Sequence, residues 1–103
     1  MELRVIAPDD DLKEQDISRI EKDLEKLERR LESYDLVRAD VRITKNGGPG
    51  REVTLDLHYG RRHLIAKAQH VKVGQAVRLV RDDILRQVND RSRGGHSSFT
   101  KGM

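Results

Sequence analysis

The sequence contains no cysteine and no tryptophan, and its aromatic residues besides histidine are one phenylalanine and two tyrosines. The missing thiols exclude disulfides, thiolate metal sites and a thiol nucleophile. The longest uninterrupted apolar stretches are two or three residues, so we expect no membrane-spanning segment. Met1 leads directly into strand-like sequence without a signal-peptide layout, and we therefore expect a cytoplasmic protein.

Charged residues are abundant and unevenly distributed. They make up 38% of the 103 residues and apolar residues make up 35%, which is enough for one domain with a modest core of Leu, Ile, Val and Ala. Residues 9–35 hold eleven acids and six bases, whereas residues 36–103 hold six acids and fourteen bases. The C-terminal two-thirds therefore has a basic surface suited to phosphates, with ordinary solvated surface as the alternative interpretation.

Apolar residues recur with two periods along the chain. Steps of three and four residues, as from Ile17 to Leu31, predict helices that bury one side. Alternating apolar and polar residues predict strands with one buried face, joined by turns at residues 46–50 and 60–61. In chain order, the expected elements are a strand at 3–7, a helix around 17–31, strands at 37–44, 52–59 and 64–69, and a helix around 73–88.

This β-α-β-β-β-α order indicates an α+β fold. A right-handed crossover should place the first two strands in parallel, and both helices should pack on one face of a four-stranded sheet. We expect residues 1–93 to form the domain and residues 94–103, which show no periodicity, to be a disordered tail. The run Asp9–Asp11 suits the start of the first helix, where free amides and the helix dipole favour negative charge.

The residues that could carry catalysis do not form a recognisable set. His58 and His63 flank the hairpin turn and could lie close together, but without cysteine or H-x-x-x-H spacing we interpret them as surface residues rather than metal ligands. His70 and His96 have no evident partner. Residues 47–50 join two strands and lack a following G-K-[ST], so they indicate a turn rather than a phosphate loop. We expect no enzyme, no metal and no cofactor.

The basic residues make the better case for a function. Arginine suits phosphate because its planar guanidinium donates two hydrogen bonds at once. The small number of aromatic residues argues against stacking on single-stranded bases, so a structured RNA is the expected partner. The candidate residues are Arg78, Arg81, Arg86 and Arg91 on the second helix, Arg93 beyond it, Arg61 and Arg62 at the hairpin tip, and Lys45 at a strand end.

An alternative interpretation of the second helix is that its charges neutralise one another. Spacing of four residues would pair Arg78 with Asp82, Asp82 with Arg86, and Arg86 with Asp90. Binding and surface pairing are both open for these arginines, whereas Arg61, Arg62, Arg91 and Arg93 have no acid four residues away and favour binding.

Three segments resemble one known family. Ile65-Ala-Lys-Ala-Gln-His70, continuing through Ala76-Val77 to residues 84–89, is similar to the last strand and helix of the ribosome hibernation-promoting factor and protein Y family. That family is also called ribosome-associated inhibitor or sigma-54 modulation protein. Residues 24–29 resemble the Lys-Leu-Glu-Lys signature of its first helix, and Ile43-Thr-Lys45 resembles the end of its second strand. The likeness covers about residues 1–93 and implies the same β-α-β-β-β-α fold.

The resemblance implies a stress or stationary-phase factor in the decoding channel of the small ribosomal subunit. Such a factor would block mRNA and tRNA access and preserve idle ribosomes, with Lys26, Arg29, Lys45 and Arg86 contacting 16S rRNA. Family members with a second domain dimerise ribosomes, and this short form should not do so by itself. We expect no membrane partner, and weak self-association stays open.

Some residues depart from the family's pattern. Asp83 and Asp90 stand where lysine is usual, and Lys72-Val73-Gly74 stands where Asp-Met/Leu-Tyr is usual. The neighbouring arginines could compensate for these acids. A second hypothesis is therefore that the family fold is repurposed as a protein-interaction module that does not bind the ribosome.

Overall fold

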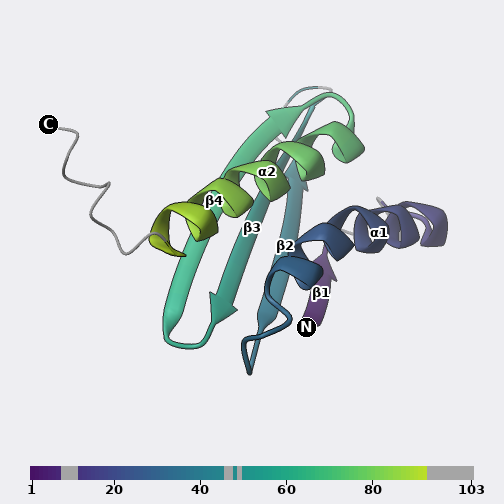
Figure 1. Ribbon diagram of the computed structural model, residues 1–103. Helices are drawn as coiled ribbons and strands as arrows, with labels where there is room; N and C mark the ends of the chain where they lie inside the picture. Colours follow the sequence, from purple (N-terminus) through teal and green to yellow (C-terminus); the bar gives the residue numbers. More distant parts are fainter. Residues whose placement is uncertain (8–11, 46–47, 49, 93–103) are drawn as a thin grey trace, which may run out of the picture.

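A computed structural model of the chain describes residues 1–7, 12–45, 48 and 50–92, with the backbone alone for residues 91 and 92. In chain order its elements are β1 (Glu2–Ile6), α1 (Glu14–Arg30), β2 (Arg38–Lys45), β3 (Arg51–Tyr59), β4 (Arg62–His70) and α2 (Val73–Ser92) (Figure 1). The expected order of elements is confirmed. The expected tail at residues 94–103 and the run Asp9–Asp11 lie outside the described residues.

The four strands form one sheet in the order β1-β2-β3-β4. β1 is parallel to β2, as expected for strands joined by a helical crossover, and the other neighbours are antiparallel. The register aligns Val41 of β2 with Leu55 of β3, and Leu55 with Ala66 of β4. All three side chains are buried, so a slip of one residue would turn apolar side chains into solvent. The alternating pattern therefore fixes the register.

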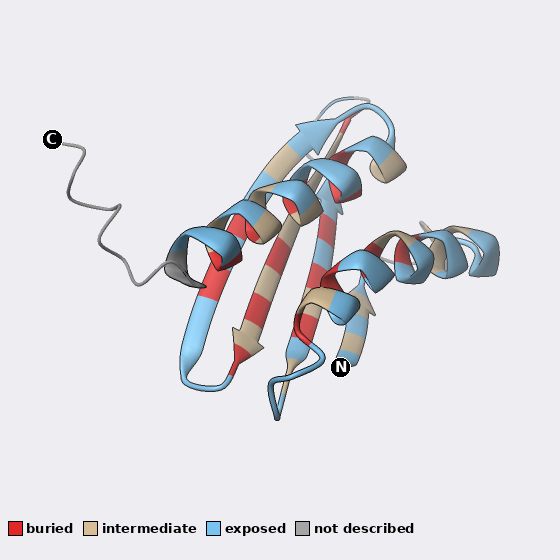
Figure 2. Cartoon of the chain, in the orientation of Figure 1, coloured by how far each residue is buried: buried red, intermediate tan, exposed pale blue. Residues whose placement is uncertain are grey.

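Both helices pack on the same face of the sheet, and the core lies between the two layers (Figure 1). Figure 2 shows buried positions along the strands and on the sides of the helices that face them. The apolar stripes predicted from the sequence are confirmed as the buried sides, with Ile17 and Val73 partly buried at their starts. The buried helical residues are Ile20, Leu24, Leu27 and Leu31 from α1 and its C-cap, and Ala76, Val77, Val80, Ile84 and Val88 from α2.

Local contacts fix both ends of α1. The helix begins at Glu14 after the N-cap Lys13, whose backbone N–H donates to the Asp16 carboxylate at 3.1 Å. Beyond the other end, the ring of Tyr34 packs edge-on against the buried ring of Tyr59, with centroids 5.0 Å apart and planes at 88°. This contact joins the end of α1 to the β3–β4 hairpin.

The second face of the sheet is not covered by either helix, as the alternation predicted. Its strand positions carry mostly polar side chains, among them Arg4, Asp40, Asp56 and Lys67. We call this side the open sheet face. Within the part of the chain that the structure describes, no helix is both long and apolar enough to cross a membrane.

Candidate nucleic-acid interface

The positive and negative charges of helix α1 follow two neighbouring stripes, which meet where the Arg29 guanidinium lies 3.9 Å from the Glu25 carboxylate. The basic residues of the helix recur at steps of three, four and three, and its acidic residues at steps of four, three and four, so each set forms its own stripe. The acidic stripe lies toward β1, because the Glu28 carboxylate is 3.4 Å from the Met1 ammonium. The basic stripe consists of Arg19, Lys22, Lys26 and Arg29, and the acidic stripe consists of Glu21, Glu25, Glu28 and Glu32.

An open groove of about 530 Å³ lies between α1 and α2. All four members of the basic stripe line it, and α2 adds two arginines from the facing side, whereas the acids in the lining are only two. The excess of positive charge makes the groove attractive to anions. The lining residues are Arg19, Lys22, Asp23, Glu25, Lys26, Arg29, Arg78 and Arg81.

Asp23 positions the two α2 arginines in this groove. Its carboxylate lies 3.4 Å from the Nε of Arg78, and its backbone carbonyl accepts a hydrogen bond from Arg81 at 3.3 Å. Farther along the helices, the Nε of Arg30 donates to the Oδ1 of Asn89 at 2.9 Å. These contacts hold α1 and α2 side by side, so the arginines of one helix and the basic stripe of the other form one surface.

A second hollow, of about 480 Å³, lies where both helices begin. Four cationic side chains and one carboxylate, that of Asp16, line it. The first turn of α2 has no acidic residue, so the positive end of its dipole is not neutralised there. The cationic lining residues are Arg19, Arg51, Lys72 and Arg78.

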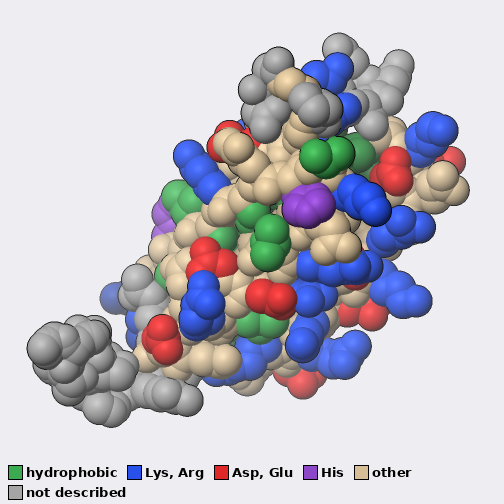
Figure 3. All heavy atoms as spheres, turned by 90° about the horizontal axis from the view of Figure 1, so that it is seen from above, with side chains coloured by type: hydrophobic (Ala, Val, Ile, Leu, Met, Phe, Trp, Pro, Cys, Tyr) green, Lys and Arg blue, Asp and Glu red, His purple; other side chains and the backbone are tan. Residues whose placement is uncertain are grey.

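The two hollows adjoin, because Arg19 and Arg78 line both of them. Together they form a continuous surface, here called the helix-side basic surface. Figure 3 shows Lys and Arg side chains gathered on the side of the molecule where α1 lies, with fewer Asp and Glu side chains among them. Its cationic residues are Arg19, Lys22, Lys26, Arg29, Arg51, Lys72, Arg78 and Arg81.

The structure brings together some of the residues proposed from the sequence and separates others. Lys26, Arg29, Arg78 and Arg81 belong to the helix-side basic surface. Lys45 is exposed at the end of β2, where its register partner is Arg51 of that surface. The exposed Arg61 and Arg62 lie at the opposite end of the sheet, at the β3–β4 turn. The side chain of Arg91 and all of Arg93 lie outside the described residues.

Arg86 lies on a different side of α2. Its Nη2 is 2.8 Å from the Asp83 carboxylate, three residues earlier. Gln87, one turn after Asp83, donates to the backbone carbonyl of Ile65 on β4 at 3.3 Å, which places this side of the helix over β4. Asp90, two turns after Asp83, shares the same side. Asp83 and Asp90 therefore stand away from the groove between the helices.

The helix arginines form ion pairs other than those that spacing of four residues suggested. Arg78 contacts Asp23 of α1 rather than Asp82, and Arg86 contacts Asp83 rather than Asp82 or Asp90. Arg81 contacts Asp82, its neighbour in sequence, at 2.9 Å. The pairing of Arg78 was wrong because the packing of α1 against α2 brings in an acid that is distant in sequence.

Sequence reasoning missed four residues of this surface, namely Arg19, Lys22, Arg51 and Lys72. The first two belong to a stretch whose net charge is negative, and the average concealed two stripes of opposite sign. A helical projection of the charges would have separated these stripes. Arg51 and Lys72 come from β3 and the turn before α2, and only the fold brings them beside α1.

Comparison with known proteins identifies the family. Residues 4–93 match the family described as sigma 54 modulation protein / S30EA ribosomal protein. The chain belongs to this family. The resemblance noted from the residues is thereby confirmed, and the matched range includes every element of the fold except the start of β1. No curated protein matches the chain.

Two solved structures share the fold of this S30EA family member. The N-terminal domain of protein Y from Thermus thermophilus has a TM-score of 0.74 at 16% identity, covering 85% of this chain and 96% of that domain. A ribosomal subunit interface protein from Coxiella burnetii has a TM-score of 0.78 at 13% identity, covering 90% of this chain and 99% of that protein. At these identities the likeness shows a common fold.

Proposed function

We propose that this protein inhibits translation by binding 16S rRNA in the decoding channel of the small ribosomal subunit, where it blocks mRNA and tRNA. The observation that carries the proposal is the helix-side basic surface in a member of the S30EA family. The similar structure from Coxiella burnetii is named a ribosomal subunit interface protein, which supports a ribosomal partner. A cytoplasmic stress or hibernation factor follows from this proposal.

The geometry suits a folded RNA better than single-stranded bases. The cationic side chains project from two packed helices, and the two tyrosines pack against each other at the end of α1. The described residues that line the two hollows include no aromatic ring for stacking, and such a basic surface recognises the shape and phosphates of RNA. Binding of each phosphate releases counterions, so the affinity should fall steeply with salt.

The ion pair with Asp23 leaves Arg78 accessible to phosphate, whereas the side chain of Arg81 is only 16% exposed. The side chain of Arg78 is 46% exposed although that of its partner Asp23 is only 15% exposed, so the guanidinium can reach solvent while it contacts the carboxylate. A phosphate can therefore share Arg78 with the Asp23 carboxylate. Asp83 and Asp90 reduce the positive charge on the β4 side of α2 but leave the groove positive. We therefore place the main RNA contact toward α1.

The experiment is co-sedimentation with purified 30S and 70S ribosomes over a range of salt concentrations. We expect wild-type protein to pellet with both particles, and Lys26→Glu/Arg29→Glu to lose at least tenfold in affinity. Removing two phosphate contacts should also make the slope of log K against log salt shallower by about two. The assay should include an in vitro translation reaction, in which wild type inhibits and the variant does not.

The matched control is Arg42→Glu/Lys67→Glu. It makes the same change in net charge at two exposed positions of the open sheet face. We expect this control to bind like wild type. Equal losses in both double variants would show that only net charge matters. Wild type that stays unbound at low salt would reject the ribosomal proposal and favour the protein-interaction module, which a pull-down of one stoichiometric protein without rRNA would then identify.

A further inference from the structure

Two histidines and an aspartate converge on the open sheet face, away from the helix-side basic surface. Asp56 and His58 are two residues apart on β3, so their side chains leave the sheet on the same side. His63 of β4 is the register partner of His58. The imidazole rings are stacked, with centroids 4.1 Å apart and planes at 7°.

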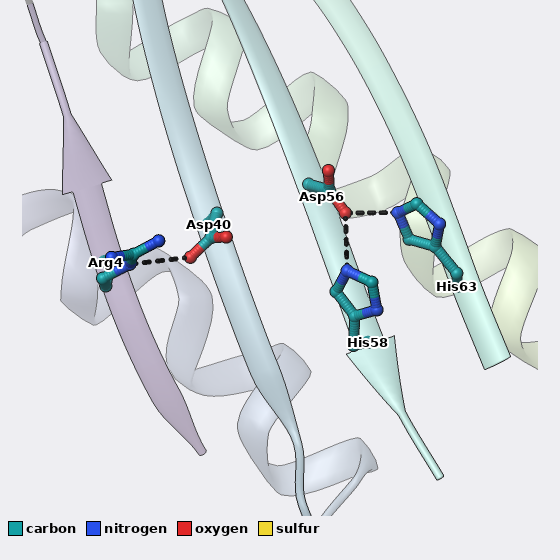
Figure 4. Close-up of polar contacts among 5 residues, drawn as sticks. All are labelled: Arg4, Asp40, Asp56, His58 and His63. Carbon is teal, nitrogen blue, oxygen red and sulfur yellow. Dashed lines mark hydrogen bonds and ion pairs between the residues drawn. The ribbon is translucent and has the colours of Figure 1, made fainter. Parts of the chain in front are cut away.

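Both imidazoles point their Nε2 atoms at one carboxylate oxygen (Figure 4). The Nε2 of His58 lies 3.3 Å from the Oδ1 of Asp56, and the Nε2 of His63 contacts the same oxygen. The three ligand-type atoms all lie within 4.8 Å of one another. We propose that Asp56, His58 and His63 form a surface site for a divalent transition-metal ion of the zinc class.

The donor set determines the kind of ion. Two imidazole nitrogens with one carboxylate suit zinc and the later first-row metals, whereas calcium and magnesium prefer oxygen ligands. Metal–ligand bonds of about 2.0–2.2 Å in a tetrahedral site place the ligand atoms about 3.4 Å apart. The three atoms, which lie within 4.8 Å of one another, would reach these separations by side-chain rotations that also turn the two parallel imidazole rings until both Nε2 lone pairs point at the ion. The two paired strands fix the backbone from which they extend.

The surroundings of the cluster carry charges of both signs, because the exposed Arg38 of β2 is the register partner of His58 on the open sheet face. Asp40 of β2 is the register partner of Asp56, and its side chain is only 15% exposed. Arg4 of β1 lies 3.3 Å from the Asp40 carboxylate and offsets the charge of Asp40 (Figure 4). The carboxylate that both imidazoles contact is that of Asp56. Three protein ligands on an exposed face leave the fourth position to water or to a donor from another molecule.

This inference departs from the interpretation of the histidines as plain surface. The H-x-x-x-H spacing, absent here, serves ligands on one turn of a helix. On a hairpin, residues directly opposite each other are neighbours, and so are residues two apart on one strand. The spacing of Asp56, His58 and His63 across the β3–β4 turn meets both conditions.

The test is isothermal titration of untagged, chelator-treated full-length protein with zinc chloride in a non-chelating buffer. We expect one equivalent to bind, and Asp56→Asn, His58→Gln and His63→Gln each to weaken binding at least tenfold. The matched control is His70→Gln/His96→Gln, which removes the other two histidines of the chain and should bind like wild type. Zinc at a hundred times its Kd should raise the Tm of wild type and of the control by about 10 °C.

The outcomes are distinct. Loss of binding in the three cluster variants, with folded circular dichroism spectra and an unchanged control, supports the site. Wild-type affinity in the cluster variants, loss in the control, or no zinc binding by wild type would overturn it. Histidine side-chain NMR adds an independent reading, because zinc should shift the Nε2 resonances of His58 and His63 and leave those of His70 in place.

Discussion

The Nε of Arg78 on α2 lies 3.4 Å from the buried Oδ2 of Asp23 on α1, and the side chain of Asp23 is 15% exposed. This pair connects two helices that are 55 residues apart in the sequence at these positions. It also puts one negative charge in the middle of the positively charged groove. Asp23 therefore joins the helices and at the same time opposes the binding of anions.

Replacing Asp23 should separate these two effects. We expect Asp23→Asn to lower the free energy of unfolding by about 1 kcal/mol, because the contact between α1 and α2 loses its charge. The same change should raise the affinity for ribosomes severalfold, since Arg78 is then free to meet phosphate. Urea denaturation and co-sedimentation measure the two quantities. A fall in both would mean that positioning Arg78 matters more than the negative charge.

The contribution of Arg86 tests how far the RNA contact extends around α2. Because Arg86 is paired with Asp83 on the β4 side, we expect Arg86→Glu to weaken ribosome binding much less than Lys26→Glu/Arg29→Glu. Co-sedimentation at one low salt concentration compares the variants directly. A loss in Arg86→Glu as large as that of the double variant would show that the β4 side of α2 also contacts rRNA.

The buried stripe of α1 should dominate stability. Leu27 is fully buried between α1 and the sheet, and we expect Leu27→Ala to cost about 2–5 kcal/mol of unfolding free energy. Leu79 of α2 is 51% exposed, so Leu79→Ala should change the free energy of unfolding by less than about 0.5 kcal/mol. Urea denaturation of both variants is the measurement, and equal effects would contradict the placement of the core.

Two glycines should respond to alanine in opposite directions. Gly60 turns between β3 and β4 with a φ of +60°, where a side chain is strained, so Gly60→Ala should destabilise the protein by about 1 kcal/mol. Gly74 lies in the first turn of α2, and an added Cβ would meet nothing within 4 Å. Gly74→Ala should stabilise the protein by about 0.4–1 kcal/mol. Thermal denaturation of the two variants measures both effects. A higher Tm for Gly60→Ala or a lower Tm for Gly74→Ala would contradict the prediction.

The fold could be predicted because its signals are local. The steps of three and four from Ile20 to Leu31 and the alternation from Val53 to Tyr59 each depend on neighbouring residues, and both patterns became buried faces. The same local signals placed His63 near His58, because a tight turn makes the flanking residues face each other.

The candidate site was only partly predictable, because tertiary packing assembles it. Lys26 and Arg78 line one groove although they lie on different helices, and no spacing rule connects them. From the sequence alone, Asp83 and Asp90 put the RNA affinity of the whole second helix in question. The orientation of α2 turns both acids away from α1. The sign of a helix's net charge says little about which of its sides carries that charge.

The edge-on contact of Tyr34 with Tyr59 gives the protein its own optical probe. The chain has no tryptophan and only these two tyrosines, so its near-ultraviolet emission comes from one pair of touching rings at the junction of α1 and the hairpin. Separation of that junction changes the surroundings of both emitters at once. Unfolding can therefore be followed by tyrosine fluorescence without any attached label.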